Sequence, residues 1–204
     1  MRGLVDLFKE STSKGAFARN YLDYLSDLMS QLDCTEIGKI LDLFLEAGER
    51  GSTIHFLGNG GSAATAAHFA NDIGFGTRAA GAPPFKVRCL ADNLAVVTAL
   101  GNDEGFEEIF VRQLEGVLRP EDVVVALSVS GNSPNVLRAV EFARKIGATT
   151  VGCTGFDGGR LRGIVDISLH VPTPRGEYGP VEDIFQILDH LIYTYLKLHR
   201  RGCL

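Results

Sequence analysis

The chain has 204 residues, of which 45% are hydrophobic and 22% charged, and its 20 Lys and Arg against 25 Asp and Glu give a formal net charge of −5. This acidic balance lacks the broad electropositive surface of proteins that bind nucleic-acid phosphates, so we expect no nucleic-acid partner unless through a local basic patch. No run approaches the ~18 consecutive apolar residues of a membrane span, and the charged N-terminus is unlike a signal peptide. We therefore expect a cytoplasmic protein without a membrane partner.

The N-terminal segment, residues 1–50, carries the periodicity of amphipathic helices. One apolar stripe recurs at spacings of three and four, at Phe17, Tyr21, Leu25, Leu28 and Leu32. Asp33 and Glu36 are spaced as in a capping box, and a second apolar stripe follows them to about residue 50. Such a hairpin cannot bury its apolar faces alone. The sequence therefore predicts a helical arm that packs on the main domain or on a neighbouring subunit.

From residue 51 to the end of the chain, short β-rich runs alternate with helical stretches. The predicted strands cover residues 53–57, 87–90, 123–127, 149–153 and 167–171. The predicted helices cover about 63–73, 105–117, 134–146 and 181–198. This alternation is typical of an α/β domain with a doubly wound, five-stranded parallel sheet, and such sheets bind ligands beyond the carboxyl ends of their strands.

A glycine loop, Gly58-Asn59-Gly60-Gly61-Ser62, follows the first predicted strand and leads into a helix. Glycines let the backbone approach a ligand closely, and the first N–H groups of a helix with a serine hydroxyl suit a phosphate or carboxylate. The loop lacks both the Walker ending and the GxGxxG spacing, so we expect no nucleotide cofactor. The alternative interpretation is a tight strand-to-helix turn without a ligand.

A serine loop, Ser128-Val129-Ser130-Gly131-Asn132-Ser133-Pro134, follows the third predicted strand. Pro134 suits the first position of a helix and Ser133 its N-cap. Three hydroxyls exceed what one cap requires, so the loop predicts a phosphate site at the helix N-terminus. Because the loop has no lysine, phosphoryl transfer is disfavoured and the phosphate is expected to serve as a binding handle.

Two predicted helices carry polar side chains at spacings of four. His68 and Asp72 share one face of the first, and Glu182, Gln186 and His190 share one face of the otherwise apolar last helix. Each could be a hydrogen-bonded neighbour in a helix interface. Together they are candidates for chemistry.

These motifs together resemble the sugar isomerase (SIS) domain family. The resemblance covers nearly the whole chain and rests on the glycine loop, residues 68–70, residues 98–103, the serine loop and the final helix ending in His190. It implies a flavodoxin-like parallel sheet that binds a phosphorylated sugar, in a homotetramer with sites near subunit interfaces. The resemblance is strongest to family members that convert sedoheptulose 7-phosphate to D-glycero-D-manno-heptose 7-phosphate for lipopolysaccharide and other surface polysaccharides.

The resemblance also implies residue roles. The substrate-binding residues it implies are Asn59, Gly60, Gly61, Ser62, Asp103, Ser128, Val129, Ser130 and Ser133. Val129 stands where the family has threonine, so that only its backbone N–H is retained. Asp72 and His190 map to the glutamate and histidine that carry the family's acid–base work. The carboxylate of Asp72 is one methylene shorter, and a misplacement of about 1 Å can cost about a hundredfold in rate.

Some family members hold zinc between the helix pair, and the corresponding residues here are His68, Asp72, Glu182 and His190. Two imidazoles and two carboxylates suit zinc. In this motif Glu182 replaces the family's glutamine and Phe185 replaces a histidine. Without a metal, Glu182 would instead serve as the catalytic base.

The reaction implied is aldose–ketose isomerisation through a cis-enediol. In it, Asp72 or Glu182 moves the carbon-bound proton and His190 moves protons at the sugar oxygens. Altered catalytic positions beside an intact phosphate loop leave a second interpretation open, a non-catalytic phosphosugar-binding regulator like the SIS protein that associates with a replication initiator. A third interpretation is an isomerase or lyase of another phosphosugar, because these loops do not encode the length of the sugar.

Overall fold

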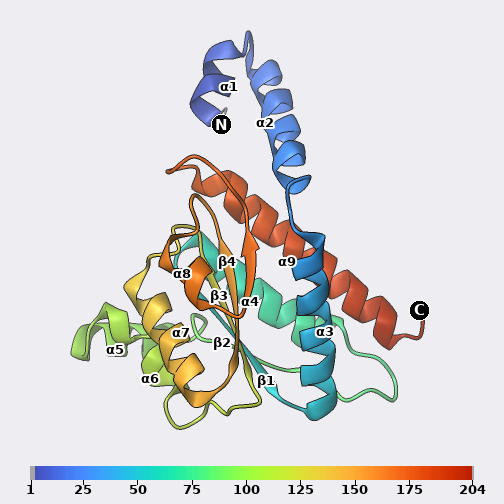
Figure 1. The fold of residues 1–204 in the computed structure, drawn as a ribbon, viewed down its shortest axis with the longest axis vertical. Helices are drawn as coiled ribbons and strands as arrows, with labels where there is room; N and C mark the ends of the chain where they lie inside the picture. The colour runs from blue at the N-terminus through green and yellow to red at the C-terminus, as the bar shows by residue number, and fades with distance from the viewer. Residues whose placement is uncertain (1–2, 204) are drawn as a thin grey trace.

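The structure, a computed structural model, describes residues 3–203 of the chain. Its one sheet comprises β1 (Thr53–Gly58), β2 (Lys86–Cys89), β3 (Val123–Ser128), β4 (Thr149–Thr154) and β5 (Ile167–His170). The strand order is β2-β1-β3-β4-β5, and every pairing is parallel (Figure 1). The predicted doubly wound sheet is confirmed, with each strand end within one residue of its expected position.

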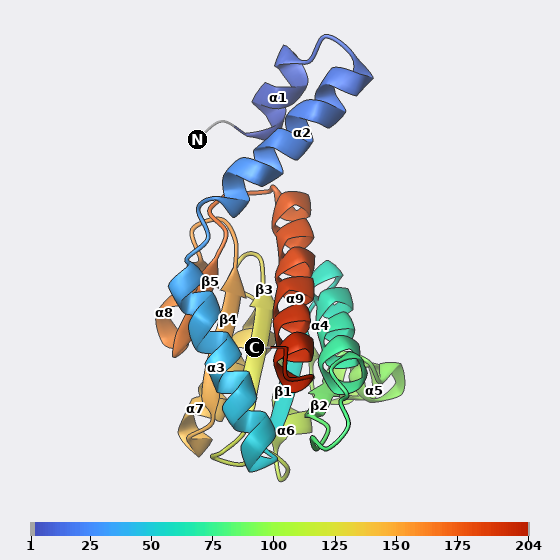
Figure 2. The same ribbon diagram turned by 90° about the vertical axis from the view of Figure 1, so that its right-hand side faces the viewer.

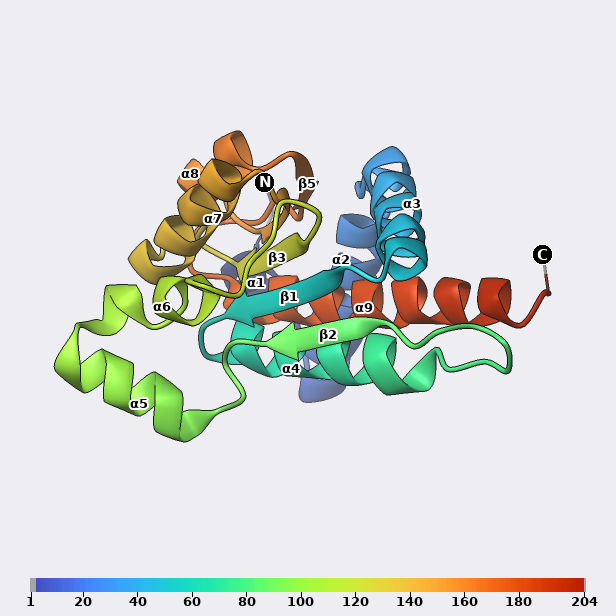
Figure 3. The same cartoon turned by 90° about the horizontal axis from the view of Figure 1, so that it is seen from below.

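Helices cover both faces of the sheet, as Figure 3 shows from below. One layer contains α3 (Cys34–Arg50), α4 (Gly61–Asn71) and α9 (Tyr178–Arg200). The other contains α5 (Leu94–Asp103), α6 (Val111–Leu114), α7 (Pro134–Ile146) and α8 (Gly159–Ile164). Alternate residues of the central strand β3 supply both cores: Val123, Val125 and Leu127 face one layer, and Val124 and Ala126 the other. The continuous apolar run of β3 therefore reflects burial on both faces.

The predicted single helix over 105–117 is wrong. This stretch contains only a 3₁₀ turn (Phe106–Glu108) and the short α6, and the longer helix α5 precedes it. Gly105 and Gly116 both have positive φ, 109° and 75°, which ends helical geometry at either side of the segment. At the end of α4 the chain passes directly into a π-helical turn (Asp72–Gly76), which prolongs that helix past its predicted end.

The N-terminal helices divide into two parts. α3 lies on the sheet, with Ile37, Ile40 and Phe44 buried in the core, whereas α1 (Leu4–Glu10) and α2 (Lys14–Met29) project from the body (Figures 1 and 2). Asp33 is the N-cap of α3, as predicted, and accepts hydrogen bonds from the first backbone N–H groups of that helix.

The projecting helices are fastened to the start of α9 by side chains. Glu177, which immediately precedes α9, accepts hydrogen bonds from the Leu4 backbone N–H (2.6 Å) and the Tyr24 hydroxyl (2.8 Å). The Tyr21 hydroxyl donates to Asp183 on the first turns of α9 (2.5 Å).

Within residues 3–203, none of the helices combines the length and the hydropathy of a membrane-spanning segment.

Candidate functional site

The glycine and serine loops meet because β1 and β3 are neighbours in the sheet, with Gly58 paired to Leu127. At their carboxyl ends the two loops and the first turns of α9 enclose a cavity of about 270 Å³. Its lining residues are Asn59, Gly60, Gly61, Ser62, Leu127, Ser128, Val129, Ser130, Ser133, Tyr178 and Glu182. All the predicted substrate-binding residues line it except Asp103, which ends α5 and accepts a hydrogen bond from Asn102.

The glycine loop requires glycine at two positions, at Gly58 for lack of space and at Gly60 for its left-handed backbone conformation. A Cβ at Gly58 would lie 2.7 Å from the Ser62 carbonyl oxygen, and Gly60 has a φ of 55°. The loop is tied to the start of α7 by paired amides, since Asn59 and Asn135 exchange hydrogen bonds of 2.9 and 2.8 Å. The amide of Asn59, predicted to contact the sugar, therefore also holds the two loops in register.

Two helix N-termini open onto the cavity. The N-cap residues of α4 and α7 are Gly60 and Ser133, and neither supplies a side-chain hydrogen bond to its helix. Ser133 occupies the predicted cap position, but its hydroxyl accepts a 3.4 Å hydrogen bond from Ser128. The first backbone N–H groups of α4 thus lack a side-chain acceptor, whereas in α7 Pro134 has no N–H and the Val136 N–H donates to Asn135 Oδ1 (3.0 Å). The helix dipoles favour an anion at both N-termini.

The segment that follows β4 supports the serine loop from behind. The Gly155 backbone N–H donates to the Val129 carbonyl (2.8 Å), and the Leu161 N–H donates to the Gly131 carbonyl (2.9 Å). Gly131 has a φ of 63°, and a Cβ there would collide with the Gly158 carbonyl. The loop is therefore held in one conformation before any ligand arrives, which lowers the entropic cost of binding.

The two loop serines allow a direct test of anion binding. Replacing Ser128 and Ser133 together by Ala is expected to weaken binding of inorganic phosphate at least tenfold, because a hydrogen bond to a charged group contributes about 1.5–3 kcal/mol. Calorimetric titration with phosphate measures this, and Ser26→Ala on the exposed face of α2 is the matched control. Equal affinities in the double variant and the control would show that these hydroxyls do not bind the anion.

A second cluster lies further along the same pair of helices. His68 Nε2 is 3.3 Å from His190 Nε2, 3.4 Å from Asp72 Oδ2 and 3.7 Å from Asp189 Oδ2. One ligand atom from each of these four side chains lies within 4.8 Å of every other. The set, three members of which were predicted, could hold a metal ion.

The fourth predicted member, Glu182, is not in this cluster, and the structure corrects its position. α4 and α9 run in the same direction, with Glu182 against Gly61 and Tyr193 against Gly76. Eight residues separate Glu182 from His190, which is about 12 Å along a helix. Glu182 therefore lines the cavity with the serines, and Asp189 takes the fourth place in the cluster.

Burial alters the acid–base properties of both carboxyl groups. Desolvation, and then the charge of nearby Asp72, raise the pKa of Asp189 to about 7, while His68 and a hydrogen bond from Gln186 act in the opposite direction. Desolvation and the neighbouring Asp183 likewise raise the pKa of Glu182 above its ordinary value. Each carboxyl thus exchanges protons at a higher pH than an exposed one.

Sequence reasoning missed Asp189 and Tyr178. Asp189 had a signal: it falls four residues after Phe185 on the buried stripe of the last helix, where a charge is unexpected. Tyr178 lines the cavity from the first position of α9 and packs edge-on against Phe156, a contact between segments that helical periodicity cannot reveal.

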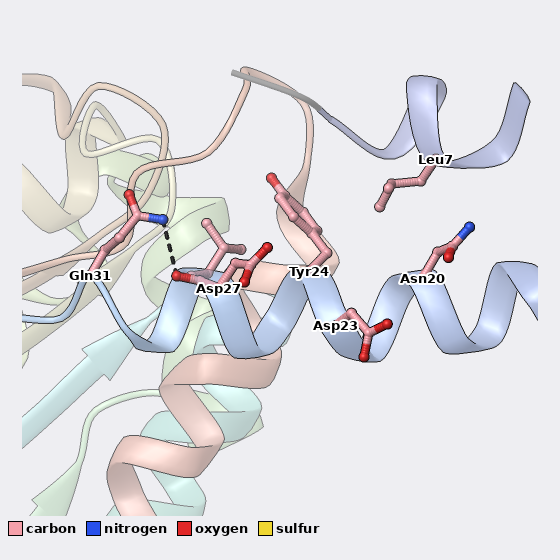
Figure 4. Close-up of a pocket in the computed structure, with 7 residues that line it drawn as sticks. Leu7, Asn20, Asp23, Tyr24, Asp27 and Gln31 are labelled. Atoms are coloured by element: carbon pink, nitrogen blue, oxygen red, sulfur yellow. Dashed lines mark hydrogen bonds between the residues drawn. The ribbon is translucent and has the colours of Figure 1, made fainter. Parts of the chain in front are cut away.

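A separate cavity of about 250 Å³ lies between α1 and α2 (Figure 4). Its lining residues are Leu7, Asn20, Asp23, Tyr24, Asp27, Leu28 and Gln31. Two carboxylates and no cationic side chain line it, so it is unsuited to a phosphate. The loop cavity is thus the better candidate site.

A doubly wound parallel sheet whose carboxyl edge carries two helix N-termini and a cluster of serines defines an α/β protein that binds a small anionic ligand. The chain belongs to the SIS domain family, whose model matches residues 18–155. The resemblance seen in the sequence motifs is thereby confirmed.

Similar proteins of this family include phosphoheptose isomerases. That of Trichlorobacter lovleyi is 40% identical over 158 residues, which are 75% of this chain and 79% of that protein. That of Geotalea uraniireducens is 42% identical over 161 residues, 76% of this chain and 84% of that protein. The structure of a phosphoheptose isomerase from Neisseria gonorrhoeae superposes with a TM-score of 0.78 at 27% identity, covering 89% of this chain and 95% of that one.

Proposed function

We propose that the protein is a phosphosugar aldose–ketose isomerase that converts sedoheptulose 7-phosphate to D-glycero-D-manno-heptose 7-phosphate. The observation that carries this proposal is the cavity that gathers the glycine loop, the serine loop and Glu182, a carboxyl group of raised pKa. The relatives named phosphoheptose isomerase support the choice of sugar.

The spacing along α4 supports a substrate whose phosphate and carbonyl lie at opposite ends. Ser62 faces the cavity in the first turn of α4, and His68 is six residues further on, about 9 Å along the axis. A phosphate held by the two loops would direct the rest of an extended sugar along the α4–α9 pair towards His68 and His190. The phosphate serves as a handle, and the reacting carbons lie away from it.

In the proposed reaction a base removes the proton from the carbon beside the carbonyl, a cis-enediol forms, and the proton returns to the neighbouring carbon. Asp72 lies among His68, Asp189 and His190, whereas Glu182 faces the cavity. We propose that Asp72 or Glu182 moves the carbon-bound proton, Glu182 only if its side chain turns from the phosphate loops towards His190, and that His190 moves the protons at the sugar oxygens.

The metal proposed for the cluster is zinc, held by His68, Asp72, Asp189 and His190. The donor set fits, because neutral imidazoles and carboxylates are zinc ligands and the four side chains converge. A bound zinc ion would supply Lewis-acid polarisation of the carbonyl oxygen. With Asp72 engaged in this way, Glu182 is the carboxylate left free to move a proton.

The role of Glu182 predicts a pH dependence. A base must be deprotonated, and because burial raises the pKa of Glu182, the acid limb of kcat/KM should lie above the range of an ordinary glutamate. Glu182→Gln, which restores the glutamine of the family motif, should lower kcat at least a hundredfold and remove that limb. If this variant keeps both the rate and the limb, the carbon proton belongs to Asp72 instead.

The reaction itself is tested by incubating the purified protein with sedoheptulose 7-phosphate in D₂O, followed by proton NMR and mass spectrometry. An isomerase should yield the heptose aldose with deuterium at the carbon beside the carbonyl. If calorimetry detects binding but no deuterium enters, the protein is the phosphosugar-binding regulator. If deuterium enters a shorter phosphosugar and not sedoheptulose 7-phosphate, the shorter sugar is the substrate.

We further propose a cytoplasmic homotetramer that supplies heptose for lipopolysaccharide. The projecting α1–α2 pair exposes Val5, Phe8 and Leu22, and α9 exposes an apolar stripe at helical spacing that a neighbouring subunit could cover. The stripe consists of Ile187, Leu191, Tyr195 and Leu198. In this proposal α1 and α2 form the intersubunit arm, α3 belongs with the sugar-binding body, and Asp103 acts across a subunit contact. Light scattering on the purified protein tests the number of subunits.

A further inference from the structure

We infer that the Glu182 carboxylate is an internal competitor of the substrate phosphate: it occupies the anion-binding start of α4 in the free protein and has to leave when a phosphorylated ligand binds. The inference deepens the proposed function and rests on its phosphate site. It concerns a position where the family motif has an uncharged glutamine, so the resemblance alone does not imply it.

Glu182 reaches into the same cavity as the loop serines. It lines that cavity from the first turns of α9, together with Ser128, Ser130 and Ser133. Its carboxylate packs on Gly61, the first residue of α4, so closely that a methyl group there would overlap both carboxylate oxygens. The carboxylate therefore lies at the positive end of α4, where the helix dipole stabilises an anion.

No other group in the described part of the chain compensates this charge. Among residues 3–203, no hydrogen bond or ion pair joins the Glu182 side chain to another group, and no Lys, Arg or His lines the cavity. Burial, followed by the charge of Asp183, raises the pKa of Glu182 above its ordinary value. The half-buried carboxylate is thus a weakly held anion, favoured only by the start of α4.

A bound phosphate needs the place that Glu182 takes. The backbone N–H groups at the start of α4 have no side-chain cap, and they are the donors that the glycine loop offers to an anion. A phosphate dianion and a carboxylate would repel each other strongly in a cavity of about 270 Å³ without a cation, because half-buried charges are poorly screened. Phosphate therefore binds only to molecules in which Glu182 has turned away, and its apparent affinity is reduced by that fraction.

The direction in which Glu182 turns links the two ends of the site. On α9 it precedes His190 by eight residues, about 12 Å along the helix, and His190 contacts His68 on α4. A side chain that leaves Gly61 along this helix pair brings its carboxylate closer to the two histidines, where the carbonyl end of the sugar is proposed to lie. The substrate phosphate thus both anchors the sugar and moves a carboxylate towards the reacting carbons, so that its binding contributes to the rate.

The test compares Glu182→Gln with Asp183→Asn, which remove one negative charge each from neighbouring positions of α9. Asp183 is the matched control, because its side chain is exposed and bonded to Tyr21 and does not line the cavity. Chelator-treated full-length protein is titrated with sulfate by calorimetry at pH 8 without sugar, since sulfate is a dianion that takes up no proton there. Glu182→Gln should bind sulfate about tenfold more tightly than the wild type, because like charges in one site are costly. Asp183→Asn should change the affinity less than about twofold, because solvent screens an exposed charge.

Sulfate binding by Glu182→Gln that is equal to or weaker than that of the wild type would overturn the inference. The position of the side chain is a second readout: in wild-type crystals grown without and with sulfate, the carboxylate should contact Gly61 only in the sulfate-free form. A sulfate bound to the serine loop beside a carboxylate still seated on Gly61 would refute the displacement. Neither measurement involves catalysis, so deuterium exchange on the same preparations separates failure of this inference from failure of the isomerase proposal.

Discussion

His190→Gln is expected to abolish turnover, lowering kcat by about a thousandfold, while the affinity for inorganic phosphate changes less than about twofold. General acid–base groups contribute about 10²–10⁴ to the rate, and glutamine cannot exchange a proton near neutral pH. The imidazole of His190 contacts that of His68 and does not line the loop cavity, so the phosphate site should be preserved.

The measurements for His190→Gln are steady-state kinetics with sedoheptulose 7-phosphate and calorimetry with phosphate. The matched control is His199→Gln on the same helix, since His199 stacks on Tyr195 outside both the cavity and the cluster. An unchanged turnover rate in His190→Gln would remove this histidine from the mechanism.

In metal-free protein, Asp189→Asn is expected to raise the free energy of unfolding at pH 8 by several kcal/mol and to change it little near pH 4. Burial first, and Asp72 second, raise the pKa of Asp189 from 3.8 to about 7 in the folded state. A pKa that is higher in the folded state contributes stability below the unfolded value, and this is lost as pH rises through the folded value. Each pKa unit corresponds to about 1.4 kcal/mol.

Chemical denaturation of chelator-treated protein between pH 4 and pH 8 measures this dependence. The wild type should lose stability across the window relative to Asp189→Asn, and the exposed-site control Asp42→Asn should follow the wild type. Zinc at pH 8 should stabilise the wild type and leave Asp189→Asn nearly unchanged. Parallel profiles for Asp189→Asn and the wild type would show that the folded protein compensates this carboxylate without metal.

The fold and the loop cavity could be predicted because both depend on local sequence and on one topological rule. Short β-rich runs between helical periods indicate parallel strands, and adjacent parallel strands bring their following loops to the same edge. The glycine and serine loops therefore had to meet once β1 and β3 were neighbours. The lack of a side-chain cap at Ser133 depends on hydroxyl orientation, which the sequence does not determine.

The metal cluster was only partly predictable. Helical spacing correctly placed Glu182, Gln186 and His190 on one face of α9, but spacing within one helix does not determine which residue lies opposite His68 on another. That register depends on close packing, such as Gly61 against Glu182, which emerges only from the assembled core. The break in the predicted helix over 105–117 had a visible signal in Gly105 and Gly116, whose effect depends on positive φ.

The hydrogen bonds of Glu177 limit how far the chain can be truncated from its N-terminus. The carboxylate that fastens α1 and α2 also precedes the first turn of α9, where Tyr178 and Glu182 face the cavity. A version trimmed to begin at α3 would leave Glu177 without the donors Leu4 and Tyr24 and would free the segment that determines where α9 begins. The N-terminal helices thus hold the start of α9, which lines the candidate site, and we expect that a minimal active fragment has to include them.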